Sequence, residues 1–198
     1  RTYLITIHGA VTRLVTIPHK ADINEFLRST TFIESSHPLI IEQVHRLNVE
    51  SLSEKEKASA LFRFVRDEVR YEFLAKLTPE YYFASNVLEK RRGFCVQKAI
   101  LLCALGRAVK IPTGLVLSDV RDHSLSPRIV ESLKTNILHH HGLNAFYLDS
   151  RWIMVDGGLS PDVVLRNKFV PVEFDGSKEA LHSAVTQTGA PHFEYLKF

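Results

Sequence analysis

A cysteine at the start of a predicted helix is the residue in this sequence best placed for covalent chemistry. The residues from Gly93 to Lys110 carry apolar side chains at helical spacing, which predicts a helix that begins near Cys95 and buries one face. Gly93 would supply the permissive backbone that a sharp turn into a helix needs. The first helical turn has unpaired N–H groups and the positive end of the helix dipole, and both stabilise an anion. Cys95 is therefore a candidate nucleophile, because the thiolate is the reactive form of cysteine.

Histidines and an aspartate further along the chain could activate such a thiol. Asp149-Ser150 separates two runs that are apolar at alternate positions, which predicts a hairpin over residues 140–155. In that hairpin His141 and Asp156 are neighbours across the strands. The carboxylate would fix the imidazole tautomer, and the imidazole would withdraw the thiol proton. Strand alternation puts His139 and His141 on one face and His140 on the other, and a change of register leaves His139 or His140 as an alternative base.

The elements that must position these groups follow from patterns along the chain. Ser53-Glu54-Lys55-Glu56 is a capping box, and the apolar spacing after it predicts a helix to about Tyr71. Two β-branched runs around His8-Gly9-Ala10 predict an N-terminal hairpin within residues 1–20. We therefore predict one α+β domain over residues 1–198, in which the cysteine-bearing helix packs on an antiparallel sheet. Further helices are predicted over residues 21–28, 38–47, 86–90 and 128–134, and further strands over residues 113–117 and 193–198.

The composition is that of an ordinary globular protein and argues against two classes of partner. The chain has 198 residues, 45% of them hydrophobic and 24% charged, so it can bury a core without disulfides. The net charge is only +3 and no long Lys/Arg run is present, so the footprint of a nucleic-acid-binding protein is missing. No apolar run approaches the ~20 residues of a membrane helix. We expect neither nucleic acid nor a membrane as partner.

The cysteines and histidines do not form the pattern of a disulfide or a metal site. Eight residues on one helix separate Cys95 from Cys103, a rise of ~12 Å that no disulfide spans. Free thiols fit a reducing compartment and no signal peptide is visible, so we expect a cytoplasmic protein. Cys103 lies on the apolar helix face and is expected in the core. We expect no cofactor and no metal, since no Cys or carboxylate lies at ligand spacing beside the three histidines.

Three stretches of the sequence resemble the transglutaminase-like core. They are Gly93-Phe94-Cys95-Val96-Gln97-Lys98-Ala99, then His141 to Leu148, then Arg151-Trp152 followed by Asp156. The resemblance covers about Ser53 to Leu159, so the core of the domain is expected at about residues 53–160. It implies the fold of papain-like cysteine proteinases. It also implies a Cys-His-Asp triad in which Cys95 is the nucleophile, His141 the base and Asp156 the group that orients the base.

Two departures from the family pattern bear on the reaction. Protein-crosslinking transglutaminases usually have a Trp directly after the cysteine, where this chain has Val96, and the common His-Ala-Trp is His141-Gly142-Leu143 here. The first departure speaks against glutamine–lysine crosslinking and leaves the triad intact. Because the fold also serves proteases, deamidases, peptide N-glycanases and cyclases, it does not select a reaction.

We expect a cysteine-dependent enzyme that acts on an amide through an acyl-enzyme. A peptidase- or deamidase-like hydrolase is favoured over a transglutaminase-like transferase, and the substrate would be a peptide, a protein or a small acyl or amide compound. The enzymatic alternative is a thioester or ester acyltransferase or a cyclase in a biosynthetic pathway. The alternative from another class is a non-catalytic binding module that keeps the fold. Tyr71 or Asn86 could help the backbone N–H of Cys95 to bind an oxyanion, although a structural role is favoured for each.

Overall fold

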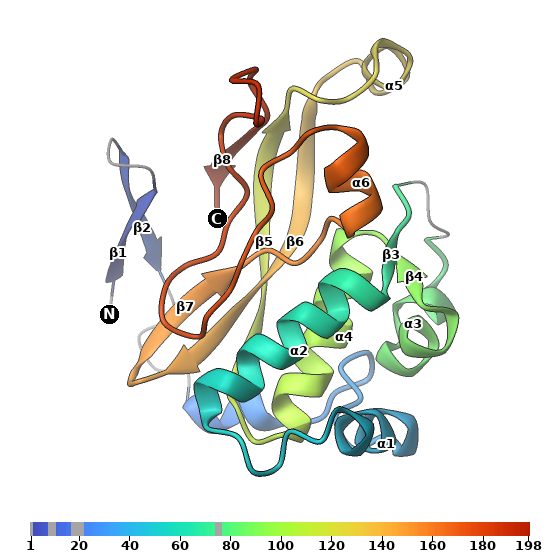
Figure 1. Cartoon of the computed structure of the whole chain (residues 1–198), viewed down its shortest axis with the longest axis vertical. Coiled ribbons are helices and arrows are strands. Elements are labelled where there is room, and N and C mark those ends of the chain that lie inside the picture. Colours follow the sequence, from blue (N-terminus) through green and yellow to red (C-terminus); the bar gives the residue numbers. More distant parts are fainter. Residues whose placement is uncertain (1, 8–10, 17–21, 74–76) are drawn as a thin grey trace.

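Helices pack against an antiparallel sheet, so the chain has the α+β class that the sequence predicted (Figure 1). The structure is a computed structural model that describes residues 2–7, 11–16, 22–73 and 77–198. Four strands form the main sheet in the order β7-β6-β5-β8, and each neighbouring pair is antiparallel. These strands are β5 (Thr113–Asp122), β6 (Ile137–Leu148), β7 (Arg151–Val155) and β8 (Phe193–Lys197).

The predicted hairpin is present as β6 and β7. Asp149 and Ser150 join the two strands with φ values of 49° and 60°, the positive values that a tight two-residue hairpin turn requires. β6 begins at Ile137, before the predicted start at His140, because it already pairs there with β5. β5 in turn extends well past the end predicted at residue 117.

The helix with the predicted capping box begins where the sequence indicated. The Ser53 N–H donates to Glu56 Oε2 at 2.9 Å, and the Glu56 N–H donates to Ser53 Oγ at 3.4 Å. This helix, α2, ends at Glu68 instead of near Tyr71, because Val69 is extended and the chain continues into β3. The helices and two short strands are η1 (Ile23–Leu27), α1 (Pro38–Leu47), α2 (Glu54–Glu68), β3 (Arg70–Tyr71), η2 (Pro79–Tyr82), α3 (Ala84–Lys90), β4 (Arg92–Gly93), α4 (Cys95–Ala108), α5 (Pro127–Leu133) and α6 (Pro161–Arg166).

The central helix α4 is buried on nearly all sides. It packs against α1, α2 and α3 and against β6 of the sheet (Figure 1). The sequence predicted one buried face, but neighbours on both sides also bury the positions between the apolar residues. Lys98 is only 1% exposed, and its Nζ donates to the carbonyls of Val69 at 2.6 Å and Arg66 at 3.3 Å. A lysine on α4 thus binds carbonyl groups at the C-terminal end of α2, which the helix itself leaves unpaired.

At the N-terminus, β1 (Thr2–Ile7) pairs antiparallel with β2 (Val11–Thr16). The turn predicted at residues 8–10 lies outside the described residues. In the part of the chain that the structure describes, no helix combines the length and the apolar character needed to cross a membrane.

Candidate active site

Cys95 is the first residue of α4, and the segments before it fix where that helix starts. β4 pairs in parallel with β3, which places Gly93 opposite Tyr71. Phe94 stays extended, and its N–H donates to Gln97 Oε1 at 3.2 Å. The chain turns from β4 into α4 here, but Gly93 does not adopt the left-handed backbone conformation that glycine permits. The Cys95 side chain therefore lies at the N-terminal end of α4, where backbone N–H groups remain unpaired, and the residue is 8% exposed.

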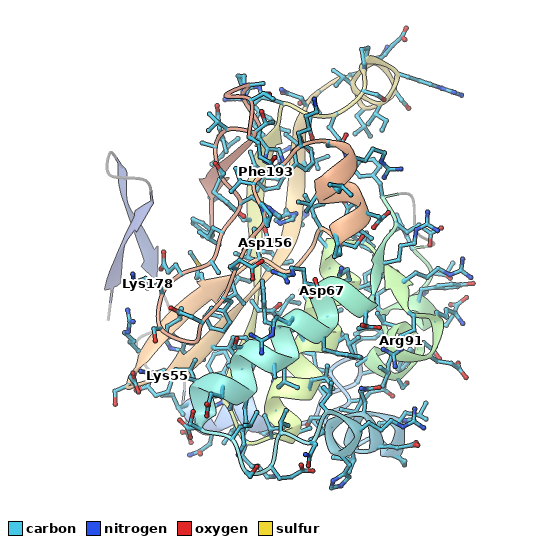
Figure 2. The ribbon with its side chains drawn as sticks, viewed as in Figure 1. Lys55, Asp67, Arg91, Asp156, Lys178 and Phe193 are labelled. Atoms are coloured by element: carbon cyan, nitrogen blue, oxygen red, sulfur yellow. The ribbon has the colours of Figure 1, made fainter. Side chains whose placement is uncertain are left out.

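His141 and Asp156 form a buried hydrogen-bonded pair. The pairing of β6 with β7 ends at Asn144 opposite Val155, and Asp156 follows where the chain turns toward α6 (Figure 2). The Asp156 side chain reaches back to His141, and its Oδ2 lies 2.6 Å from His141 Nε2. Asp156 is fully buried and His141 is 6% exposed, so water competes little for this bond.

A β-bulge beside His141 separates it from the two preceding histidines. The register between β5 and β6 shifts at Asp119, which stands opposite both His139 and His140. Asp119 Oδ1 lies 3.1 Å from His139 Nδ1 and accepts the His140 N–H at 3.4 Å, while His140 has a φ of 60°. Simple alternation of faces, which the sequence suggested, does not continue through this bulge. His139 and His140 are exposed, and the buried His141 is the one bonded to Asp156.

Cys95, His141 and Asp156 surround a single point in the interior. An added Cβ at Gly158 would lie 3.1 Å from Asp156 Oδ1, 3.6 Å from Cys95 Cβ and 3.8 Å from His141 Cε1. The charge of Cys95 is also one of the influences that raise the pKa of His141. Because Asp156 occupies Nε2, the other ring nitrogen, Nδ1, is the one left for the thiol. The three residues predicted from the sequence are thus brought together.

The charges in this cluster support one another. Burial alone would lower the pKa of His141, but the negative charges of Asp156 and Cys95 and the hydrogen bond to Asp156 raise it well above its ordinary value. Burial alone would raise the pKa of Asp156, but His141 and His182 hold it well below its ordinary value. Asp156 is therefore ionised at neutral pH, and a protonated His141 is stable beside it.

Two further residues contact Asp156 that the sequence had not indicated. The Tyr195 hydroxyl donates to Asp156 Oδ2 at 2.7 Å, and His182 Nε2 lies 3.4 Å from Oδ1, at ion-pair distance but without hydrogen-bond geometry. The backbone N–H of Gly158 donates to Oδ1 at 3.1 Å. Tyr195 and His182 come from the C-terminal segment, and no spacing in the sequence links that segment to Asp156.

The remaining residues singled out in the sequence have separate environments. Burial, with the charge of Cys95 next in importance, raises the pKa of Tyr71 well above its ordinary value, so this phenol is protonated at neutral pH. The Asn86 amide instead donates to the Glu80 carbonyl at 2.5 Å. Cys103 lies in the core as expected, where burial raises the pKa of its thiol to about 12.

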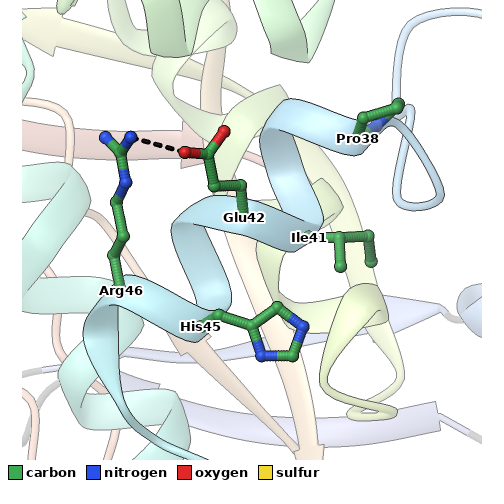
Figure 3. Close-up of a pocket in the computed structure, with 5 residues that line it drawn as sticks. All are labelled: Pro38, Ile41, Glu42, His45 and Arg46. Atoms are coloured by element: carbon green, nitrogen blue, oxygen red, sulfur yellow. Dashed lines mark hydrogen bonds and ion pairs between the residues drawn. The ribbon is translucent and has the colours of Figure 1, made fainter.

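Two hollows described by the structure are not lined by Cys95 or His141. The hollow in Figure 3 has a volume of about 650 Å³ and lies on α1, where Arg46 and Glu42 form an ion pair at 2.5 Å. A pocket of about 360 Å³ comes closer to Asp156, because His182 and Leu159 contribute to its lining. Among the described residues, no group of three or more His, Cys, Asp or Glu side chains could hold a metal ion.

The chain belongs to the transglutaminase-like superfamily, whose sequence profile it matches over residues 42–157. This match includes Cys95, His141 and Asp156, and it ends before the segment that carries His182 and Tyr195. No curated protein sequence matches the chain.

Two solved structures share the fold. One is a protein of Cytophaga hutchinsonii described as a candidate cysteine protease, with a TM-score of 0.54 and 18% identity over 92% of this chain and 55% of that chain. The other is the periplasmic domain of TgpA from Pseudomonas aeruginosa, with a TM-score of 0.50 and 19% identity over 68% of this chain and 46% of that chain. The chain thus has the transglutaminase-like fold, related to that of papain-like proteases, and spans about half the length of both proteins.

Proposed function

We propose that the protein is a cysteine-dependent acyl-transfer enzyme that cleaves an amide bond of a peptide or protein through an acyl-enzyme. The observation that carries the proposal is the buried cluster of Cys95, His141 and Asp156, in which His141 is hydrogen-bonded to Asp156 and the thiol lies beside them at a helix N-terminus. Each member has the environment that its role needs: the helix start favours a thiolate, and the carboxylate favours an imidazolium.

In the proposed reaction, the Cys95 thiolate adds to the carbonyl carbon of the substrate amide. The negative charge moves to the carbonyl oxygen, and the backbone N–H of Cys95 is available to stabilise it at the start of α4. The tetrahedral intermediate then expels the amine, to which His141 gives its proton. Water next adds to the thioester with His141 as the base, and the carboxylic acid leaves while His141 returns the proton to the thiol.

Hydrolysis is favoured over transfer to an amine on two grounds. Val96 stands where crosslinking transglutaminases usually have a Trp, and one of the structures that share the fold is described as a candidate cysteine protease. We also propose a cytoplasmic location, supported by the free thiols of Cys95 and Cys103.

The acyl-enzyme is the species to test. The protein is mixed with the phenyl thioester of N-acetylglycine, and peptide mass mapping locates the acyl group. We expect it on Cys95 in the native protein and in Cys103→Ala, and we expect none at position 95 in Cys95→Ala. Adding glycine methyl ester then compares water with an amine as acceptor. Acylation of Cys103 alone, or equal labelling of all three proteins, would overturn the proposal.

A further inference from the structure

The last strand of the sheet reaches the carboxylate of the candidate site. β8 pairs with β5, with Tyr195 opposite Val120, and the Tyr195 hydroxyl donates to Asp156 Oδ2 at 2.7 Å. We propose that Tyr195 is a positioning residue, whose hydroxyl fixes the Asp156 carboxylate and sets how strongly that carboxylate holds the protonated His141. This rests on the proposed function of Cys95, His141 and Asp156.

The hydrogen of the Tyr195 hydroxyl has a defined direction. The hydroxyl oxygen accepts the backbone N–H of His182 at 3.1 Å, so its own hydrogen is left for Asp156. Burial and the charge of Asp156 raise the pKa of Tyr195 well above its ordinary value, so the hydroxyl keeps this proton through the neutral range. A backbone group thus holds Tyr195 in the role of a neutral donor to a buried carboxylate.

Tyr195 and His141 share one oxygen atom of Asp156. Oδ2 lies 2.6 Å from His141 Nε2 and accepts a hydrogen bond from the Tyr195 hydroxyl at 2.7 Å. Oδ1 instead accepts the backbone N–H of Gly158 at 3.1 Å. A neutral donor draws negative charge from this oxygen without adding charge of its own. It therefore weakens the attraction of Asp156 for the imidazolium, which lets His141 release its proton to the leaving group more readily.

The ring of Tyr195 is held independently of its hydroxyl. It packs against Phe193 with centroids 5.3 Å apart, stacks on Phe198 at 5.6 Å and meets the His141 ring edge-on at 6.4 Å. Phenylalanine at this position would keep these contacts and remove only the donor.

The other titratable groups that face His141 and Asp156 are Cys95, His182, and at longer range Tyr71, Lys98 and His192.

The experiment reads the His141 imidazole directly. Cys95 is first blocked with methyl methanethiosulfonate, and the histidine Cε1 atoms are labelled with carbon-13. The NMR signal that is missing in His141→Gln is assigned to His141, and its position is then followed as the pH is varied. We expect Tyr195→Phe to raise the pKa of His141 by about half a unit to one unit, because Asp156 regains the shared charge. Tyr147→Phe is the control, since that ring packs on Trp152 at 5.3 Å, near the β6–β7 turn.

A second substitution tests the sign without removing the hydroxyl. Replacement of Tyr195 alone by 3-fluorotyrosine makes the hydroxyl a stronger donor, so the pKa of His141 should fall below that of the native protein. It also covers the case in which Tyr195→Phe fails to fold. A pKa of His141 that does not respond to the substitutions at Tyr195, or that moves in the opposite direction, would overturn the role proposed for Tyr195.

The proposed function is tested separately by iodoacetamide alkylation of the unblocked thiol. If alkylation does not depend on His141, the acyl-transfer proposal fails, while the NMR titration still reports whether Tyr195 controls the carboxylate.

Discussion

Gly142→Ala should separate the candidate thiol from its base by adding a single methyl group. A Cβ at Gly142 would lie 2.5 Å from Val96 Cα, 2.8 Å from Val96 N and 2.9 Å from Val96 Cγ2. Two of these are backbone atoms, so no change of rotamer relieves the contact. Gly142 follows His141 on β6, and Val96 follows Cys95 on α4. The methyl group therefore pushes β6 and α4 apart at this point and lengthens the distance between Cys95 and His141.

The size of this displacement follows from the contact distances. Ordinary van der Waals contact begins at 3.4 Å, so Gly142 and Val96 must move apart by about 0.9 Å. A misplacement of about 1 Å in a reacting arrangement costs about 100-fold in rate. Overpacking of this kind costs about 1–3 kcal/mol in the free energy of unfolding. We expect Gly142→Ala to fold with reduced stability and to lose about 100-fold in the rate of Cys95 alkylation at pH 6.

Gly114→Ala is the matched control, because it adds the same methyl group to the neighbouring strand. The nearest atoms to a Cβ at Gly114 are Cδ1 and Cε1 of Phe26, both at 3.4 Å, which is ordinary contact. Both variants and the native protein are compared by iodoacetamide alkylation with mass mapping at Cys95 and by thermal unfolding. If Gly142→Ala is alkylated as fast as Gly114→Ala, the contact between Gly142 and Val96 does not set the geometry of Cys95 and His141.

Two other substitutions test the electrostatics of the interior. Asp156→Asn removes the charge opposite His141, so we expect alkylation at pH 6 to fall about tenfold or more per folded molecule, a larger effect than the loss of stability; a normal rate per folded molecule with a large drop in melting temperature would contradict this. Lys98 has a pKa lowered by burial to about 7, so between pH 7 and 10 the unfolded chain binds more protons and Lys98 makes stability rise with pH. Urea unfolding measures this at pH 7.5 and at pH 8.5. Between these two pH values, the free energy of unfolding of the native protein should rise by about 1 kcal/mol more than that of Lys98→Met. Equal changes in both proteins would show that Lys98 is not buried as a titrating amine.

The elements around the site could be predicted because their signals are local. Helical spacing of apolar residues gave the start of α4 at Cys95, and the turn at Asp149-Ser150 gave the hairpin of β6 and β7. Both patterns span fewer than twenty residues or so, a range over which backbone geometry determines which side chains meet. The prediction that His141 and Asp156 are neighbours across the strands was wrong in register, because the paired residues end at Asn144 and Val155 and the Asp156 side chain reaches His141 from beyond them. The meeting of all three side chains was not local, and there the family resemblance supplied what spacing could not.

The features that the sequence did not reveal depend on contacts between distant segments. Tyr195 reaches Asp156 because β8 pairs with β5, a strand some seventy residues earlier in the chain. Lys98 is buried because α2 ends beside α4 and presents free carbonyl groups to it. The bulge at His140 places a non-glycine residue at positive φ opposite Asp119, and a pattern of alternating side chains gives no sign of it.

The pH dependence of iodoacetamide alkylation at Cys95, in the native protein and in His141→Ala, tests the proposed nucleophile–base pair most directly. The thiol lies at the start of α4, near a histidine that Asp156 holds by a hydrogen bond. We therefore expect a rate that stays high below pH ~7 in the native protein and collapses in the variant. A slow rate that titrates near ~8.5 in both proteins, like an ordinary free thiol, would contradict a Cys–His pair and with it the proposed acyl-transfer activity.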